Sequence, residues 1–417
     1  MRIRTILPSL IALALAAAPA RAGRAPFFPM GVWYEGGAGA MRDNLIPDNP
    51  KLAAARYLRD FKDIAAHGVN AVVVPNSPPE HHKILLDAAK KAHLRVILEL
   101  GAAGGPLGEM IRGSRPYSED EVTKTLEDRL KPIAGHPALW RVQLLDEPPA
   151  DAFGRYGRVA AALRVAAPGL EPFCCLIGSG DFDGFLTASQ SNVAAFDCYP
   201  IGPASPEGDL APLQNFADQA RLAGLACARN NADAYAVIQA HAIPGGLRFP
   251  TPGEMRCMTY SALATGSRGV FWFLYQSEWW NKEKGEMMDG LVDSQYRARP
   301  LWGEVTRLTS EIRPLAAALA DLRPDPAPGV VECEQSVRLL RDGANHPYVF
   351  VVNMDTKSAQ TVHVRMRVEN GSSRVSRVGS KAKLHPRVEA GWLTFTDSLP
   401  PGGGGLYEIR VRLAGSR

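Results

Sequence analysis

A regular alternation of short apolar runs and longer amphipathic segments constrains the fold of this 417-residue chain more than any other feature. Eight runs are rich in β-branched or aromatic residues and have the length of buried parallel strands. These runs are Phe28–Tyr34, Ala71–Pro75, Arg95–Leu100, Trp140–Leu145, Phe173–Ile177, Ala194–Tyr199, Ala234–Ala240 and Gly269–Tyr275. The segments between them are long enough for crossover helices. Eight such units predict an α/β fold of the (β/α)8 barrel type.

Local signals support helices between these runs. Gly68 follows Lys51–His67 as a helix-ending glycine, and Ser118 begins a Ser-x-x-Glu capping box. After the eighth run, Gln295–Leu322 is predicted as one long helix. An open doubly wound sheet is the competing architecture, but it requires a glycine motif between the first strand and a helix. The Gly-rich run at 36–40 precedes a loop rich in Asn and Pro, so we interpret it as a flexible loop.

The composition changes after Leu322. The segment 323–329, Arg-Pro-Asp-Pro-Ala-Pro-Gly, is typical of a stiff linker. Beyond it, runs with a period of two are separated by turn residues and indicate a small antiparallel β domain. These runs are Ser336–Arg341, Tyr348–Val352, Thr361–Val368, Trp392–Thr396 and Tyr407–Val411, with Gly402–Gly405 as a predicted loop. We therefore predict a barrel over 23–322, a linker over 323–329 and a β-sandwich over 330–417.

The first residues have the layout of a secretory signal peptide. Arg2 and Arg4 precede an apolar run that ends at Ala18, and Ala20-Arg21-Ala22 offers a cleavage site after Ala22. A membrane anchor is the alternative, but the run is too short to span a bilayer, and no later run is long enough. We expect residues 1–22 to be removed and the protein to be secreted or periplasmic, without a membrane span.

Charge and cysteine spacing argue against several classes of partner. The formal net charge is +4 and no basic stripe stands out, so a nucleic-acid partner is not expected. The six cysteines form no Cys-x-x-Cys pair, which gives no support to a zinc or redox motif. We predict neither a metal nor another cofactor. Export permits a disulfide, whose connectivity the sequence does not define, and the oligomeric state stays open.

Polar and aromatic residues gather at the carboxyl ends of the predicted strands, where barrels of this type carry their functional sites. In strand order they are Trp33, Tyr34 and Glu35; Asn76; Glu99; Asp146 and Glu147; Asp197 and Tyr199; Gln239 and His241; and Trp272, Tyr275, Gln276, Trp279 and Trp280. Sugars suit this mixture, because their C–H faces pack on aromatic rings while their hydroxyls bond carboxylates, amides and imidazoles. Hydrolysis of a glycosidic bond also requires two carboxyl groups.

Asp146-Glu147-Pro148 is the sharpest of these features, since it directly follows the fourth apolar run. Two adjacent acids at the mouth of a buried sheet repel each other, so we expect one to have a raised pKa and to act as a general acid. The alternative is structural, with Asp146 capping a helix or pairing with an arginine.

These motifs resemble the clan of barrel glycoside hydrolases that carry an Asn-Glu-Pro-type motif after the fourth strand. Glu147 and Pro148 match that motif, with Asp146 in place of the asparagine. Asp197-Cys198-Tyr199-Pro200 resembles the Asp-x-Tyr-Pro that similar barrels carry on strand six. The resemblance implies a glycoside hydrolase of poly- or oligosaccharides with Glu147 as its acid.

One position departs from the clan, whose nucleophile is a glutamate at the end of strand seven. This chain has Gln239 there, and an amide cannot act as a carboxylate nucleophile. Asp197, Glu35 or Asp146 is expected to supply the second carboxylate, with Glu99 as a further candidate. A barrel that binds carbohydrate without cleaving it is the alternative function, and a lyase or esterase is a third. Several of these residues also have structural interpretations, ion pairs for the acids and barrel packing for Trp272 and Tyr275.

Overall fold

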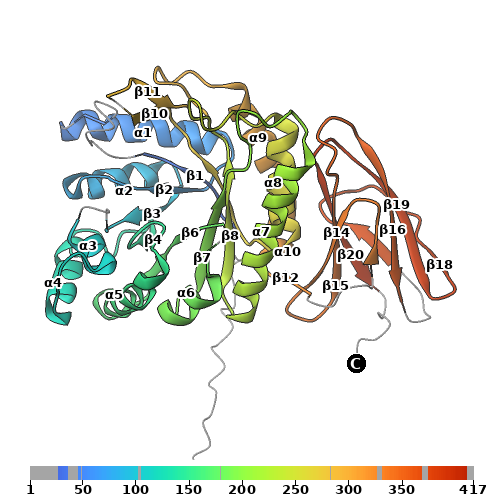
Figure 1. Cartoon of the computed structure of the whole chain (residues 1–417), viewed down its shortest axis with the longest axis horizontal. Coiled ribbons are helices and arrows are strands. Elements are labelled where there is room, and N and C mark those ends of the chain that lie inside the picture. Colours follow the sequence, from blue (N-terminus) through green and yellow to red (C-terminus); the bar gives the residue numbers. More distant parts are fainter. Residues whose placement is uncertain are drawn as a thin grey trace, which may run out of the picture.

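The computed structural model describes residues 27–35, 46–47, 49–101, 105–178, 180–281, 283–325, 331–368 and 374–410. The predicted signal peptide and the Gly-rich run at 36–40 lie outside the described residues. A parallel sheet forms the centre of the larger domain (Figure 1), and its strands follow the eight predicted runs. They are β1 (Met30–Trp33), β2 (Ala71–Val74), β3 (Arg95–Glu99), β4 (Leu139–Gln143), β5 (Glu171–Phe173), β6 (Cys175–Ile177), β7 (Val193–Cys198), β8 (Asp233–Gln239) and β9 (Val270–Phe273).

The sheet closes into a barrel. Its order is β5-β4-β3-β2-β1-β9-β8-β7-β6, so β5 and β6 are the two ends. Only Cys174 separates these two strands, which means that both ends belong to one interrupted barrel strand. The Cys174 carbonyl still accepts a hydrogen bond from the Ala195 N–H at 2.8 Å. The fold is therefore the predicted (β/α)8 barrel, with β5 and β6 together forming the fifth strand.

Helices connect the barrel strands and cover the barrel from outside (Figure 1). They are α1 (Pro50–Ala66), α2 (His82–Lys91), α3 (Pro106–Arg112), α4 (Glu119–Leu130), α5 (Phe153–Ala166), α6 (Phe182–Ser189), α7 (Leu210–Arg229), α8 (Pro252–Ala264) and α9 (Pro300–Ile312). The sequence did not predict α3, nor the hairpin of β10 (Glu278–Asn281) and β11 (Glu286–Met288).

The predicted long helix over 295–322 is wrong. The chain forms α9, then a 3-10 turn at Arg313–Leu315, then α10 (Ala316–Leu319). Pro300 starts α9 because its fixed φ suits the first turn of a helix. Pro314 lies in the 3-10 turn, where its missing N–H prevents a continuous α-helix.

Large aromatic side chains fill the inside of the barrel. Trp33, Phe173, Tyr235 and Phe271 contact one another there, with ring centroids about 6 Å apart. Gly31 makes room for them, because a Cβ at this position would lie 2.2 Å from the Phe271 ring. This packed interior leaves the carboxyl ends of the strands as the place for a site.

The C-terminal domain consists of two antiparallel sheets. One has the order β12-β14-β15-β20-β17 and the other β13-β16-β19-β18. The strands are β12 (Arg323–Pro324), β13 (Val331–Glu332), β14 (Ser336–Arg341), β15 (Pro347–Val352), β16 (Gln360–Arg367), β17 (Arg374–Arg377), β18 (Arg387–Glu389), β19 (Trp392–Leu399) and β20 (Gly404–Arg410). All five predicted runs appear as strands, and their inward residues form a separate apolar core.

Two expectations for this part of the chain need correction. Arg323 and Pro324, predicted as linker, pair as β12 with β14. Gly404 and Gly405, predicted as loop, pair in β20 with β15. In both places the backbone completes a sheet, and neither Pro nor Gly at a strand end prevents this.

Helix α8 lies between the barrel and the C-terminal domain (Figure 1), and every residue from Glu254 to Ala264 is buried. An ordinary surface helix of a barrel would leave one polar face in water. The Arg256 guanidinium bonds Glu304 and Glu311 at 2.9–3.1 Å beside this helix. Among the described residues, no helix combines the length and apolar character needed to cross a membrane. All six cysteines are described, and each carries a free thiol.

Candidate functional site

Glu147 occupies a constrained backbone position just beyond β4. Its φ of 43° lies in the left-handed region, which costs a residue with a side chain about 1–2 kcal/mol. Its N–H donates to the Cys175 carbonyl at 3.1 Å, which fixes the turn against β6. The side chain is exposed. Strain of this kind is retained where surrounding contacts fix the backbone, and it is common at functional sites.

The Glu147 carboxyl lies close enough to the Asp197 carboxyl, on β7, to share a hydrogen bond with it. Burial raises the pKa of Asp197 to about 8, assisted by the charge of Glu147 and by this hydrogen bond. Burial also raises the pKa of Asp146 to about 8, assisted by the charges of Glu147 and Glu99. The predicted rise in pKa beside neighbouring acids is therefore present, and it affects Asp146 and Asp197.

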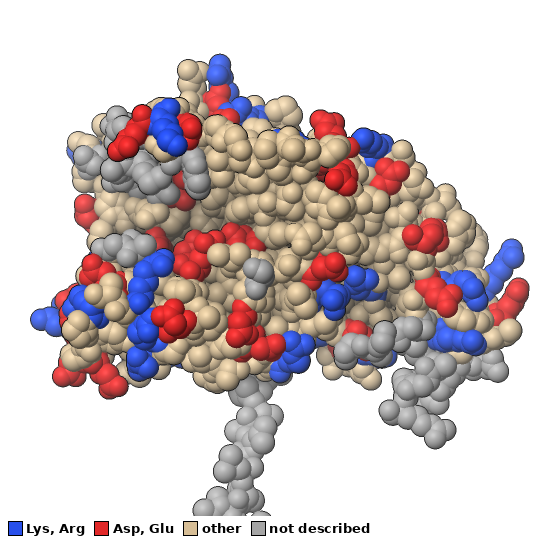
Figure 2. All heavy atoms as spheres, viewed as in Figure 1, with Lys and Arg blue, Asp and Glu red and all other residues tan. Residues whose placement is uncertain are grey.

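Four acids from three strands thus lie close enough to influence one another: Glu99, Asp146, Glu147 and Asp197. The Asn76 N–H donates to the Glu99 carboxylate at 2.7 Å, and Asn76 also has a positive φ of 54°. Figure 2 shows a hollow over this half of the barrel with acidic side chains gathered along its edge. The strand ends that the sequence selected on β2, β3, β4 and β7 therefore converge.

A pocket of about 500 Å³ opens beside the Glu147–Asp197 pair. Its lining comes from the turn after β4, from the ends of β6 and β7, from α7 and from the loop after β8: Glu147, Ile177, Gly178, Asp197, Cys198, Tyr199, Asn215, Gln219 and Leu247. The volume lies within the range of small-molecule sites, about 300–1,000 Å³. Of the predicted site residues, Glu147, Asp197 and Tyr199 share this pocket.

Asn215 and Gln219 are pocket residues that the sequence did not reveal. They are four residues apart on α7 and therefore point the same way. Gly178 brings the strand close to this helix, because a Cβ there would lie 2.9 Å from the Asp197 carbonyl and 3.6 Å from Gln219 Cβ. The spacing of the two amides was visible in the sequence, but nothing indicated which face of the helix meets the strand ends.

His241 lies behind the pocket in an aromatic group. Its ring is 4.6 Å from Tyr199 and 5.0 Å from Phe273, and its Nδ1 is 3.0 Å from the Phe273 carbonyl. Burial lowers the pKa of His241 to about 4. The imidazole is therefore neutral at pH 7 and fully buried, so the predicted contact with a substrate is not supported.

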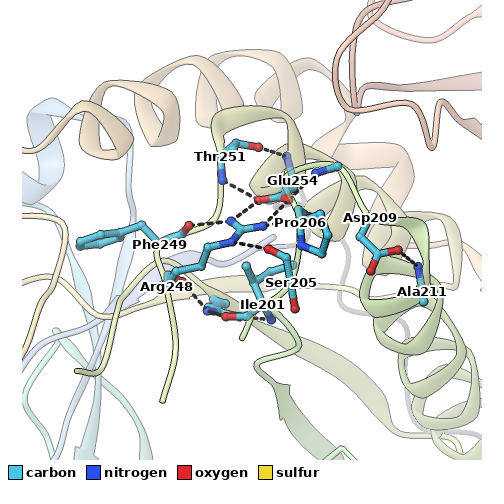
Figure 3. A network of polar contacts seen from close by, with 11 residues as sticks. Ile201, Ser205, Pro206, Asp209, Ala211, Arg248, Phe249, Thr251 and Glu254 are labelled. Carbon is cyan, nitrogen blue, oxygen red and sulfur yellow. Dashed lines mark hydrogen bonds and ion pairs between the residues drawn. The ribbon is translucent and has the colours of Figure 1, made fainter. Parts of the chain in front are cut away.

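Gln239 is also fully buried, and its amide joins two loops. Its Oε1 accepts from the Ile201 N–H at 2.9 Å, while Nε2 donates to the carbonyls of Ile201 and Arg248 at 3.1 and 3.0 Å. Figure 3 shows how Arg248 continues this connection to Ser205 and Glu254. The position that carries a nucleophile in the resembling clan is here a structural amide, which contradicts the prediction of substrate binding.

We expect Gln239→Glu to destabilise the protein without adding activity. A carboxylate cannot donate to the Ile201 and Arg248 carbonyls, and its charge would be buried beside them. The free energy of unfolding should fall by about 2–4 kcal/mol, measured by urea denaturation. Gln295→Glu, at an exposed position, is the matched control. A fully stable Gln239→Glu protein with higher hydrolytic activity would contradict this role.

Several aromatic residues predicted to bind substrate are instead packing residues. Tyr34 and Tyr275 face α1, where their hydroxyls donate to Asp60 at 2.9 Å and Asp63 at 2.8 Å. Trp272 has no exposed surface and belongs to the same helix-facing core. These three predictions are wrong, because the side chains point away from the barrel interior.

The remaining predicted residues lie around the first and last strands. Trp33 packs inside the barrel against Phe271 and is 4% exposed, which leaves almost no surface for a sugar. Gln276 is buried and donates to the Glu35 carbonyl at 2.8 Å, so its predicted substrate contact is also unsupported. Glu35 itself is buried, and its predicted catalytic role remains a prediction.

Trp279 is half-buried in β10, and the Trp280 side chain lies outside the described part of the chain. Their contact with a ligand stays a prediction. Across the described ranges, no group of three or more His, Cys, Asp or Glu side chains has the arrangement of a metal site.

The comparisons with known proteins agree on the fold. No family model and no curated protein matches the sequence. A glycoside hydrolase family 5 structure from Bacteroides vulgatus is similar over 93% of this chain and 90% of its own, with 12% identity and a TM-score of 0.59. A family 5 mannosidase mutant from Rhizomucor miehei covers 71% of this chain and 96% of its own, with 14% identity and a TM-score of 0.51.

A third structural relative is the β-galactosidase of the psychrophilic Marinomonas ef1. It is 14% identical with a TM-score of 0.51, and the match covers 70% of this chain. This chain spans only 60% of the length of that enzyme. These structural neighbours are thus glycoside hydrolases with a barrel of the same type. At sequence identities of 12–14%, the likeness establishes the fold of this chain and no more.

Proposed function

We propose that this protein is a glycoside hydrolase of poly- or oligosaccharides, with Glu147 as its general acid. The observation that carries the proposal is that Glu147 and Asp197, from two different strand ends, line one pocket at the carboxyl ends of the barrel strands. Protonation of a leaving sugar oxygen requires a carboxylic acid that keeps its proton near neutral pH. The structural likeness to glycoside hydrolases supports the same conclusion.

Asp197 serves in this proposal to keep a proton available to Glu147. Because Asp197 is proposed to hold this proton, another carboxylate is required to act on the opposite side of the sugar. Glu99 on β3 (8% exposed) and Glu35 after β1 (3% exposed) are the carboxylates proposed for that second role, and Glu99 is the better candidate because it keeps more exposed surface and its charge acts on Asp146.

The proposal is tested by incubating the purified protein with a panel of polysaccharides and oligosaccharides. Release of reducing ends, with the product anomer followed by NMR, would support hydrolysis and report retention or inversion. Glu35→Ala and Glu99→Ala should then be compared, because azide can occupy the space left by the carboxylate and restores turnover when that carboxylate was the nucleophile of a retaining enzyme. Binding without any release of reducing ends would favour the alternative, a non-catalytic carbohydrate-binding barrel, which Gln239 makes the second candidate.

Hydrolysis should decline as the pH rises through about 8. Below this value the Asp197 carboxyl holds its proton, and above it Asp197 loses that proton. Because loss of this proton leaves a second carboxylate beside Glu147, activity should fall about tenfold per pH unit above it. A profile of kcat/KM from pH 5 to 10 measures this limb. Asp197→Asn should displace or remove it, whereas an unchanged limb would contradict the role of Asp197.

We also propose that the protein is exported, on the basis of the signal-like residues 1–22. Cell fractionation and N-terminal sequencing test this directly. A chain that begins at Gly23 in the extracellular or periplasmic fraction is expected. An uncleaved chain in the cytoplasm would contradict it.

A further inference from the structure

The pocket beside Glu147 has two chemically different sides. Glu147 and Asp197 bring carboxyl groups from the strand ends, while Asn215 and Gln219 bring amides from α7. The rim carries Ile177, whose side chain is 57% exposed although it is large and apolar. An apolar rim with convergent polar groups is typical of a small-molecule site.

The oxygen of the Gln219 amide, Oε1, is buried and has no partner among the described residues. A buried acceptor without a donor costs about 1–3 kcal/mol. A ligand that brings a hydroxyl or an N–H into the pocket would relieve this cost. The Asn215 residue is exposed and lines the pocket, and its Nδ2 makes a long contact of 3.9 Å with Cys198 Sγ.

The charge of the site limits what can enter. Two acidic side chains, Glu147 and Asp197, line the pocket. A carboxylate in this lining repels any anion that enters the pocket, and juxtaposed like charges reduce affinity strongly. No lysine or arginine lines the pocket as described, so a ligand carboxylate or sulfate would find no counter-charge there.

We propose that this pocket binds one uncharged sugar unit, that Gln219 and Asn215 select it, and that uronic acid and sulfated units are rejected. The inference rests on the proposed function and adds the substrate class to it. Ile177 at the rim suits an apolar C–H face, and the two amides suit neutral hydroxyl or N-acyl groups.

Methyl glycosides of glucose, galactose, mannose and N-acetylglucosamine serve as probes, each titrated in saturation-transfer NMR against methyl glucuronide and methyl galacturonide. At least one neutral glycoside should bind, and both uronides should bind at least tenfold more weakly. Gln219→Ala and Asn215→Ala should each lower the affinity for the neutral glycoside by roughly 3- to 10-fold. Gln214→Ala, an exposed amide on the same helix, is the matched control and should bind like the wild type.

Binding of a uronide as tightly as the neutral glycoside would overturn the inference. So would unchanged binding by both amide variants, or no binding of any methyl glycoside at millimolar concentration. The proposed hydrolysis fails separately: amide-dependent sugar binding without cleavage of any substrate would refute hydrolysis and leave the sugar pocket in place. Cleavage of a substrate that neither amide variant changes would support hydrolysis and refute the role of the two amides.

Discussion

Glu147→Gln should lower kcat about 100- to 10,000-fold on any substrate that the protein cleaves, the range by which general acids accelerate reactions. The amide has the size of the carboxyl but carries no transferable proton. Because it also removes a charge that raises the pKa of Asp197 and Asp146, the substitution should not lower the melting temperature at pH 7. Loss of activity with unchanged or higher stability separates a catalytic role from a structural one.

Steady-state kinetics and thermal unfolding on the same preparations provide the measurement. Glu80→Gln is a suitable control, since Glu80 is exposed in the segment after β2 at the same end of the barrel. It should keep wild-type kinetics. Wild-type turnover by Glu147→Gln would remove Glu147 from the mechanism, and a large drop in melting temperature would assign it a structural role.

Glu254→Ala should destabilise the protein by about 3–5 kcal/mol, the usual effect of removing one partner of a buried ion pair. Its carboxylate, with a side chain 1% exposed, accepts from Arg248 at 2.8 Å twice, from the Gly208 N–H at 2.8 Å and from the Thr251 N–H at 2.7 Å. Figure 3 shows these contacts joining the loop before α7 to the start of α8. Burial alone would raise the pKa of Glu254, but these bonds lower it overall.

Urea denaturation measures this effect, and Glu127→Ala on the exposed face of α4 is the control, expected within about 0.5 kcal/mol of the wild type. Since Leu247 precedes Arg248 and lines the pocket, Glu254→Ala should also raise KM where the folded protein remains active. A change in stability below about 1 kcal/mol would show that Arg248 finds another partner.

The sequence predicted the barrel well, because each buried strand is a compact apolar run followed by a helical period. All eight runs and all five C-terminal runs became strands. Errors arose where local signals were weak or misread. Helix α3 is only seven residues long, and Pro314 interrupts a segment whose apolar pattern continues through it.

The sequence predicted where the site lies, but not which side chains point into it. The prediction that the site lies at the strand ends is correct for Glu147, Asp197 and Tyr199, which line one pocket. Tyr34 and Trp272 were misassigned because parallel strands are apolar on both faces, so no alternation shows which side chains point inward. Asn215 and Gln219 come from a helix, and their contact with the strand ends depends on the close approach at Gly178, which only the folded chain reveals.

The burial of α8 on all sides changes how the C-terminal domain should be regarded. This helix belongs to the barrel in sequence, yet its outer face is covered by the β-sandwich. A barrel cut after residue 322 would present that face of α8 to water. The β-sandwich is therefore not a detachable accessory module, and the two parts should unfold as one cooperative unit.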